Sequence, residues 1–171
     1  MKFVMINGPS CSGKSVIIQR VIEAREGYYY LSFDGQRWFF SKYDGNVHAA
    51  DVEEVVLVLG EALCKKKYNI ICDSGLEKYF REKLLAIAKK NDYEIIEFNL
   101  ETKFEILLDR FKKRVALATQ NPYIKIPNTS LERFKELYDI YEKEKSVPQR
   151  TFRTDNEQSE EEIAKSILEI I

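Results

Sequence analysis

Short apolar runs alternate with amphipathic stretches along this chain from end to end. Five runs rich in apolar, aromatic or β-branched residues predict strands at 3–7, 28–33, 68–72, 94–100 and 150–153. Six stretches in which apolar residues recur every three or four positions predict helices at 15–26, 51–67, 77–91, 102–118, 131–145 and 159–171. Strands that alternate with helices imply parallel strands joined by helical crossovers, so we expect a layered α/β domain.

The apolar positions also predict which face of each helix is buried. In the helix at 51–67 the inward side chains are expected to be Val52, Val55, Val56, Leu59 and Leu63. In the helix at 159–171 they are expected to be Ile163, Ile167 and Ile170. Gly27 is expected to close the first helix as its C-terminal cap.

Composition narrows the classes of protein. The chain has 171 residues, with 27 Lys+Arg against 28 Asp+Glu and a net charge of -1. This length fits one domain, expected to span residues 1–171, and the mixed charge argues against a partner held by bulk charge alone. No apolar run approaches the roughly 20 residues that span a bilayer. The run before Gly8 is too short for a signal peptide, so we expect no membrane partner.

Cysteine and histidine exclude further chemistries. Cys11, Cys64 and Cys72 are odd in number and match no zinc or CxxC spacing, which is typical of reduced thiols in a cytoplasmic protein. His48 is the single histidine, which excludes a multi-histidine metal site. A hydrolase triad would have no imidazole other than that of His48.

The strongest motif lies between the first predicted strand and the first predicted helix. Its residues are Gly8, Pro9, Ser10, Cys11, Ser12, Gly13, Lys14 and Ser15, which fit the phosphate-binding pattern G-x-x-x-x-G-K-[ST] known as Walker A. An ordinary glycine-rich turn before a helix does not explain the Lys-Ser pair at this offset. A Rossmann site is excluded because G-x-G-x-x-G is absent.

Each position of this motif has a chemical reason. Gly8 and Gly13 allow a tight turn and a close approach of the backbone to phosphates. The loop N–H groups and the helix N-terminus attract phosphate oxygens. Lys14 would neutralise the β- and γ-phosphates, and the Ser15 hydroxyl would join the shell of Mg²⁺. The motif therefore predicts ATP and Mg²⁺ as cofactors.

Carboxylates follow two of the other predicted strands. Asp34 is expected to end the second strand, with Arg37 three residues later, and Asp73 is expected to end the third strand beside Ser74. Parallel strands place these ends at one edge of the sheet, where ligands bind. Asp34 could then accept the proton of an attacking hydroxyl, and Asp73 has the Walker B arrangement that supports Mg²⁺. The alternative is that both are turn or capping residues.

A basic strip runs from the fifth predicted helix into a proline-containing loop. Arg110 and Arg114 are four residues apart and share a helix face, and no acid occurs from Arg110 to Lys125. The strip could act as a lid over the nucleotide, around residues 112–128, or it could be a solvated basic helix end. No N-K-x-D segment is present, which argues against a guanine-specific GTPase.

Together these residues resemble the P-loop kinases of the polynucleotide-kinase-like group, which sits near zeta toxins, chloramphenicol phosphotransferase and nucleoside monophosphate kinases. Asp34 to Arg37 resembles the D-x-x-R stretch of phage polynucleotide kinase, in which the Asp is the general base and the Arg binds the phosphate beside the acceptor. Arg110 and Arg114 resemble its R-x-x-x-R lid pair. The chain departs from that pattern in Cys11, where glycine is commoner, and in a single acid at Asp34 instead of two.

The resemblance implies a three-layer P-loop NTPase fold, nucleotide-kinase-like, with a five-stranded parallel sheet in the order 2-3-1-4-5 and a helical lid. It implies an ATP-dependent kinase that phosphorylates a hydroxyl of a small molecule; a polynucleotide 5′-hydroxyl kinase or an ATPase switch without an acceptor are the alternatives. The catalytic residues would be Lys14, Asp34 and Arg114. The nucleotide would be bound by the phosphate-binding motif together with Arg110 and Arg114. Ser15 and Asp73 would bind Mg²⁺. The acceptor would be bound by Asp34, Arg37, Asp73 and Ser74.

Overall fold

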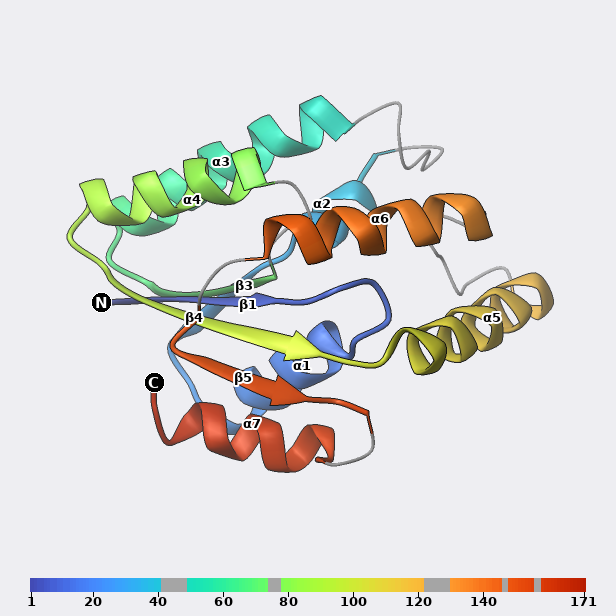
Figure 1. The fold of residues 1–171 in the computed structure, drawn as a ribbon. Coiled ribbons are helices and arrows are strands. Elements are labelled where there is room, and N and C mark those ends of the chain that lie inside the picture. The colour runs from blue at the N-terminus through green and yellow to red at the C-terminus, as the bar shows by residue number, and fades with distance from the viewer. Residues whose placement is uncertain (41–48, 74–77, 122–129, 146–147, 156–157) are drawn as a thin grey trace.

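The five strands of the described chain form one parallel sheet, as predicted. The computed structural model describes residues 1–40, 49–73, 78–121, 130–145, 148–155 and 158–171. The strands are β1 (Lys2–Asn7), β2 (Tyr28–Leu31), β3 (Asn69–Asp73), β4 (Glu94–Glu101) and β5 (Arg150–Arg153). They pair side by side in the order β2-β3-β1-β4-β5 (Figure 1), which confirms the expected strand order.

Helices cover both faces of the sheet. Within the described residues they are α1 (Lys14–Ala24), α2 (Phe33–Arg37), α3 (Ala49–Lys65), α4 (Lys78–Lys90), α5 (Phe104–Gln120), α6 (Leu131–Glu144) and α7 (Glu160–Leu168). Figure 1 shows α3 and α4 on one face and α1 and α7 on the other. This gives the three-layer α/β arrangement.

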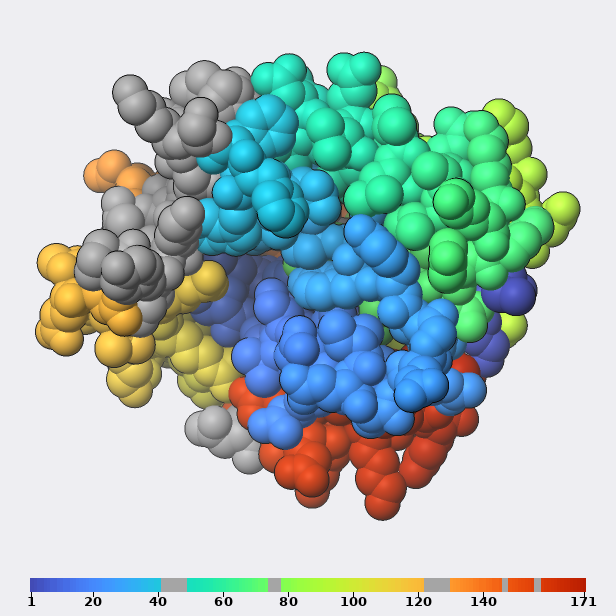
Figure 2. Space-filling view, turned by 180° about the vertical axis from the view of Figure 1, so that it is seen from behind, coloured from blue at the N-terminus to red at the C-terminus, as the bar shows by residue number. Residues whose placement is uncertain are grey.

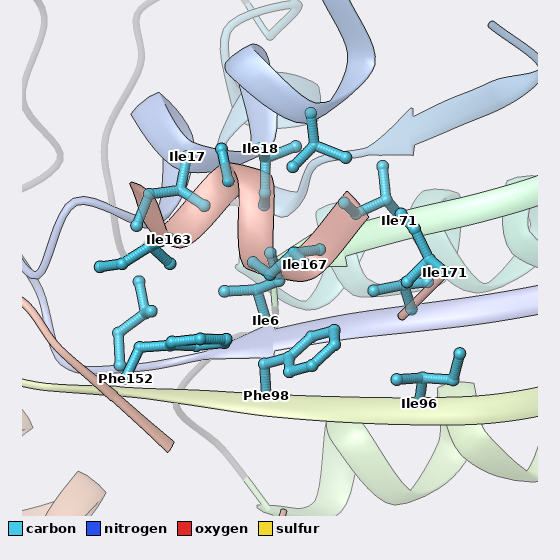
Figure 3. Packing of buried hydrophobic residues seen from close by; sticks show 14 residues of the cluster. Ile6, Ile17, Ile18, Ile71, Ile96, Phe98, Phe152, Ile163, Ile167 and Ile171 are labelled. Carbon is cyan, nitrogen blue, oxygen red and sulfur yellow. The ribbon is translucent and has the colours of Figure 1, made fainter. Parts of the chain in front are cut away.

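Two separate cores fill the spaces between these layers. Alternate residues of a strand point to opposite faces, so Val4 and Ile6 of β1 pack toward α1 and α7 while Phe3 and Met5 pack toward α3 and α4. Figure 3 shows the first core, in which Ile17 and Ile18 of α1 and Ile163 and Ile167 of α7 lie over the sheet. The sheet is thus buried on both faces, which is why its strands are nearly continuous in apolar residues.

The buried helix faces differ from the prediction at two positions. Val55 and Ile170 are 41% and 39% exposed, so neither lies inward as the spacing suggested. In α3 the buried stripe runs instead through Gly60, where an added Cβ would lie 3.4 Å from Leu31 Cδ2 and 3.4 Å from Leu84 Cδ2. A glycine has no apolar side chain, so a hydrophobic pattern does not detect that it belongs to the buried face. The first helix also ends sooner than expected, with Arg25 as its C-cap in place of Gly27.

Helices α5 and α6 form a small cluster of their own beyond the end of β4. Leu107 and Phe111 of α5 pack against Phe134 of α6, and we call these three residues the α5–α6 cluster. The Phe111 and Phe134 rings are stacked with centroids 4.4 Å apart. Figure 1 shows α5 extending outward from the edge at which β1, β3 and β4 end. None of the helices in the described ranges has the length and hydrophobicity to cross a membrane.

Candidate active site

The phosphate loop, residues 8–15, connects β1 to α1 at the C-terminal edge of the sheet. Gly13 is the N-cap of α1 with φ 94° and ψ 4°, a left-handed conformation that glycine adopts without steric cost. No acidic residue lies in the first turn of α1, so the helix supplies no carboxylate of its own to the positive end of its dipole. This helix N-terminus is therefore suited to an anion.

The loop is recessed. In Figure 2 the deep-blue residues after β1 lie at the bottom of a hollow whose rim includes α2 in light blue and α5 in yellow. A Cβ on Gly8 would lie 2.7 Å from Ser12 Oγ and 3.1 Å from the carbonyl oxygen of Leu100 in β4. Only glycine allows the loop to approach β4 this closely.

Lys14 is the central charge of the site. Its Nζ donates to the carbonyl oxygens of Gly8, at 2.8 Å, and Pro9, at 2.9 Å, so the side chain curls back over the loop. Burial lowers the pKa of Lys14, while the nearby Asp73 and Asp34 carboxylates raise it. Lys14 therefore lies within electrostatic reach of both predicted acids, as well as of Arg114.

Asp73 ends β3, as predicted, and is 7% exposed. Its Oδ2 accepts a hydrogen bond from the Tyr30 hydroxyl at 3.0 Å, and its Oδ1 accepts one from the Phe33 N–H at 3.4 Å. Burial raises the pKa of Asp73, and the Asp34 carboxylate raises it further, against the opposing effect of Lys14. A buried carboxylate is the kind of group that a metal ion would complement.

Tyr30 is a residue of this site that sequence reasoning missed. It lies on β2 with its side chain toward α1, and its hydroxyl donates to Asp73 Oδ2 at 3.0 Å. Burial raises the pKa of Tyr30, with Asp73 adding to the effect, so the hydroxyl remains a donor at neutral pH. Three tyrosines in succession resembled a plain aromatic strand, and no local signal singled out the one that meets Asp73.

The donor set around Tyr30 fits a magnesium ion. Ser15, in the first turn of α1, is exposed, and Asp73 accepts a hydrogen bond from the Tyr30 hydroxyl. Mg²⁺ prefers carboxylate, hydroxyl and water oxygens and keeps several of its waters. These two residues supply that chemistry beside the phosphate loop.

Asp34 requires a correction. It was expected to end the second strand, but β2 stops at Leu31 and Asp34 lies in the first turn of the short helix α2. Ser32 is the N-cap, accepting from the Gly35 N–H at 2.9 Å. The Ser-x-x-Gly turn ends the strand early because a capping hydroxyl offers the backbone an alternative partner.

Asp34 and Arg37 nevertheless share one turn of α2. Arg37 Nη1 lies 3.3 Å from Asp34 Oδ1, and its guanidinium stacks over the Phe33 ring at 4.7 Å. The Asp34 side chain is 52% exposed, against 19% for Arg37. The carboxylate is thus open to solvent, and the guanidinium is held against an aromatic ring.

The two arginines of α5 lie in different surroundings. Arg110 is half-buried and donates from Nη1 to the carbonyl oxygen of Cys11 at 3.4 Å and from Nη2 to that of Thr154 at 2.5 Å. Arg114, one turn later, is exposed and close enough to Lys14 to lower the lysine pKa. Residues 112–120 of the predicted lid continue α5 as regular helix. Residues 122–129 and Ser74 lie outside the described part of the chain.

Arg81 joins two helices. It lies on α4 and donates to the carbonyl oxygen of Glu144, at the end of α6, over 3.1 Å. The Glu144 carboxylate in turn accepts from the Lys78 N–H at 3.0 Å, at the first residue of α4. These reciprocal contacts satisfy helix-end groups of both elements, so Arg81 has a structural partner within the fold.

No protein-family model matches the sequence, and no curated protein matches it either. Solved structures do. A candidate kinase from Chloroflexus aurantiacus superimposes with a TM-score of 0.75 at 13% identity, covering 99% of this chain and 98% of that one. The APS kinase CysC of Mycobacterium tuberculosis, solved with AMPPNP and APS, gives 0.66 at 15% identity over 99% and 96%. A chain of the Pnkp1/Rnl/Hen1 RNA repair complex gives 0.64 at 19% identity over 86% and 48%.

For the first two structures these likenesses extend over nearly the whole of this chain and of the other. Their identities are too low to carry more than the fold. The chain therefore has the fold of the P-loop kinases.

Proposed function

We propose that residues 1–171 form a single kinase domain that transfers the γ-phosphoryl group of ATP to a hydroxyl of a small molecule. The observation that carries this proposal is the position of Lys14, which lies within electrostatic reach of Asp34 and Asp73 at one sheet edge. A phosphate-binding lysine beside two carboxylates supplies what phosphoryl transfer needs: charge neutralisation, metal support and a proton acceptor.

Each residue has a role in this proposal. The amides of the phosphate loop and Lys14 bind the phosphates, and Ser15 and Asp73 hold Mg²⁺. When bound, Mg²⁺ would neutralise charge on the phosphate oxygens. Tyr30 keeps the Asp73 carboxylate in place through its 3.0 Å hydrogen bond. Asp34 accepts the proton of the acceptor hydroxyl, since its carboxylate is open to solvent and acts on Lys14 of the phosphate loop.

The arginines would divide the remaining work. Arg37 orients the acceptor together with Asp73 and Ser74, and Arg114 delivers positive charge to the transferring group from the exposed face of α5. The lid, around residues 112–128, would exclude water from the reaction. Arg110 is engaged by backbone carbonyls, so its contribution to nucleotide binding would be indirect.

A small acceptor is favoured over a nucleic acid by the charge balance. The 27 basic residues are matched by 28 acidic ones, which leaves little surplus to bind a long phosphate backbone. A polynucleotide 5′-hydroxyl acceptor is the second candidate, supported by the likeness to a chain of an RNA repair complex. Small acceptors are supported by the likeness to an APS kinase.

The test is phosphate transfer from labelled ATP with Mg²⁺ to a panel of hydroxyl compounds and to an oligonucleotide with a 5′-hydroxyl. We expect transfer to a small compound. Transfer to the oligonucleotide alone would favour the second candidate, and ATP hydrolysis that no acceptor changes would favour an ATPase or nucleotide switch.

Asp34→Asn tests the proposed base. We expect transfer to fall by at least about 100-fold, with ATP affinity largely unchanged, because a neutral amide cannot accept the proton. Asp92→Asn is a matched control, since Asp92 is exposed in the turn between α4 and β4, away from the phosphate loop. Unchanged turnover in Asp34→Asn would remove Asp34 from the role.

A further inference from the structure

The phosphate loop is held from outside by two side chains that belong to other elements. Thr154, directly after β5, donates from its hydroxyl to the carbonyl oxygen of Ser12 at 3.0 Å. Arg110 of α5 donates to the neighbouring carbonyl of Cys11 at 3.4 Å and to the Thr154 carbonyl at 2.5 Å. Two successive carbonyls of the loop are thus fixed by partners more than 40 residues away in sequence.

The direction of each hydrogen bond around Thr154 follows from its chemistry. Thr154 is 4% exposed, and its one hydroxyl hydrogen is directed at Ser12, because a carbonyl can only accept. Its oxygen therefore accepts from the Thr102 hydroxyl, to which it is also bonded, and from Arg110 Nη1 at 3.5 Å. Thr102 supports Thr154 through this bond, whereas the hydrogen bond to the Ser12 carbonyl comes from Thr154 alone.

These bonds orient the peptide planes of the loop. In a trans peptide the C=O and the following N–H point in opposite directions, and the described chain has no cis peptide. Fixing the Ser12 carbonyl toward Thr154 therefore directs the Gly13 N–H away from Thr154. The same holds one residue earlier, where the Cys11 carbonyl faces Arg110 and the Ser12 N–H donates back to the Pro9 carbonyl at 3.3 Å. The Gly13 N–H is thereby turned away from β5 and left to an anion, whereas the Ser12 N–H is used inside the loop by the Pro9 carbonyl.

The side chain of Cys11 adds a second link between the loop and the pair of helices α5 and α6. Cys11 has a left-handed backbone, with φ 65°, which is unfavourable for a residue with a Cβ. Its side chain packs against the α5–α6 cluster. Cys11 thus connects the loop to these helices through its side chain and through its carbonyl, which accepts from Arg110.

We propose that Thr154 and Arg110 are positioning residues that preorganise the phosphate loop by fixing the carbonyls of Ser12 and Cys11, and that Thr154 is required for full affinity toward phosphate-bearing ligands. The inference rests on the proposed function only in that the loop binds a nucleotide. Neither residue needs to touch the ligand. Without these bonds the two peptide planes would have to be ordered during binding, which weakens it.

The test compares Thr154→Val, Thr102→Val and Thr154→Ser in binding of ADP and of inorganic pyrophosphate, measured by calorimetry without an acceptor. Val keeps the shape of Thr and removes the hydroxyl. We expect Thr154→Val to weaken both ligands by roughly tenfold, the worth of one hydrogen bond. Thr102→Val removes a hydroxyl from the same buried pair but leaves the hydrogen bond from Thr154 to the Ser12 carbonyl. The affinities of this variant for ADP and pyrophosphate should therefore stay within about twofold of those of the unaltered chain.

Thermal unfolding separates positioning from simple destabilisation. Each Val variant loses one partner of the Thr102–Thr154 pair, so we expect both to lower Tm by about 2–8 °C. Thr154→Ser should restore the affinity, because its hydroxyl can reach the same carbonyl. Equal binding by the two Val variants, or unchanged binding by Thr154→Val, would overturn the inference.

The result also separates this inference from the proposed function. If the unaltered chain binds ADP and pyrophosphate but phosphorylates no acceptor, the kinase proposal fails while the comparison of variants still decides the role of Thr154. If the unaltered chain binds neither ligand, both proposals fail.

Discussion

The close approach of Gly8 to β4 gives the sharpest test of how the phosphate loop is built. In Gly8→Ala the new Cβ would lie 2.7 Å from Ser12 Oγ and 3.1 Å from both Cβ and the carbonyl oxygen of Leu100. Leu100 is a fully buried residue of β4, paired in the sheet with Phe152, so it cannot move aside. The loop must instead shift outward by a few tenths of an ångström.

The expected loss of stability follows from the contacts of the new Cβ with Ser12 and Leu100. Overpacking a close-fitted site costs about 1–3 kcal/mol. For a chain of this size, that corresponds to a fall in Tm of roughly 2–12 °C. The same outward shift moves the loop amides and Lys14, whose Nζ is bonded to the Gly8 carbonyl at 2.8 Å. Nucleotide affinity should therefore fall together with stability, by about tenfold or more.

Thermal unfolding and ADP calorimetry on the same preparation measure both effects. Gly60→Ala is a matched control, because it makes the same change in the middle of α3, where the new Cβ would meet Leu31 and Leu84 at an ordinary 3.4 Å. Replacing a helix glycine by alanine favours the helix by up to about 1 kcal/mol, so this control should be neutral or stabilising and should bind ADP normally. A Gly8→Ala variant as stable as the control, with unchanged ADP affinity, would refute the close-packing argument.

Two further changes test the buried carboxylate. Tyr30→Phe removes the 3.0 Å hydrogen bond to Asp73 and should lower Tm by roughly 3–12 °C, as expected for a bond to a charged group. Tyr28→Phe, on the same face of β2, is the control and should change Tm little. Equal shifts of the two variants in thermal unfolding would contradict the role of Tyr30. Asp73→Asn should abolish Mg²⁺-dependent transfer yet leave stability unchanged or higher by up to about 2 kcal/mol in urea titrations. The direction of this change in stability follows from the pKa of Asp73, which burial raises. The folded state favours the uncharged carboxyl, so the stability that this group contributes is lost as pH rises through its pKa in the folded state. A clear loss of stability in Asp73→Asn would contradict this reasoning.

The sequence by itself determined the layered fold because its signals are local and strong. Each strand is a short apolar run and each long helix an amphipathic stretch, so their alternation leaves few possible topologies. The phosphate loop was equally readable, since its glycines, lysine and serine are needed at fixed offsets within eight residues. The expected edge positions of Lys14 and Asp73 followed from the ends of parallel strands.

The tertiary structure decided what depends on contacts between distant segments. The end of β2 at Leu31 was missed, because a capping hydroxyl at Ser32 competed with an aromatic run of high strand propensity. Tyr30 and Thr154 carried no local signal, since each acquires its partner only when the sheet brings β2 beside β3 or the end of β5 beside the phosphate loop. The sequence identifies Arg110 as a basic residue, but its hydrogen bonds to the Cys11 and Thr154 carbonyls depend on how α5 packs in the fold. Spacing along the chain can specify a loop, whereas the partners that fix its peptide planes come from elements that meet only in the folded molecule.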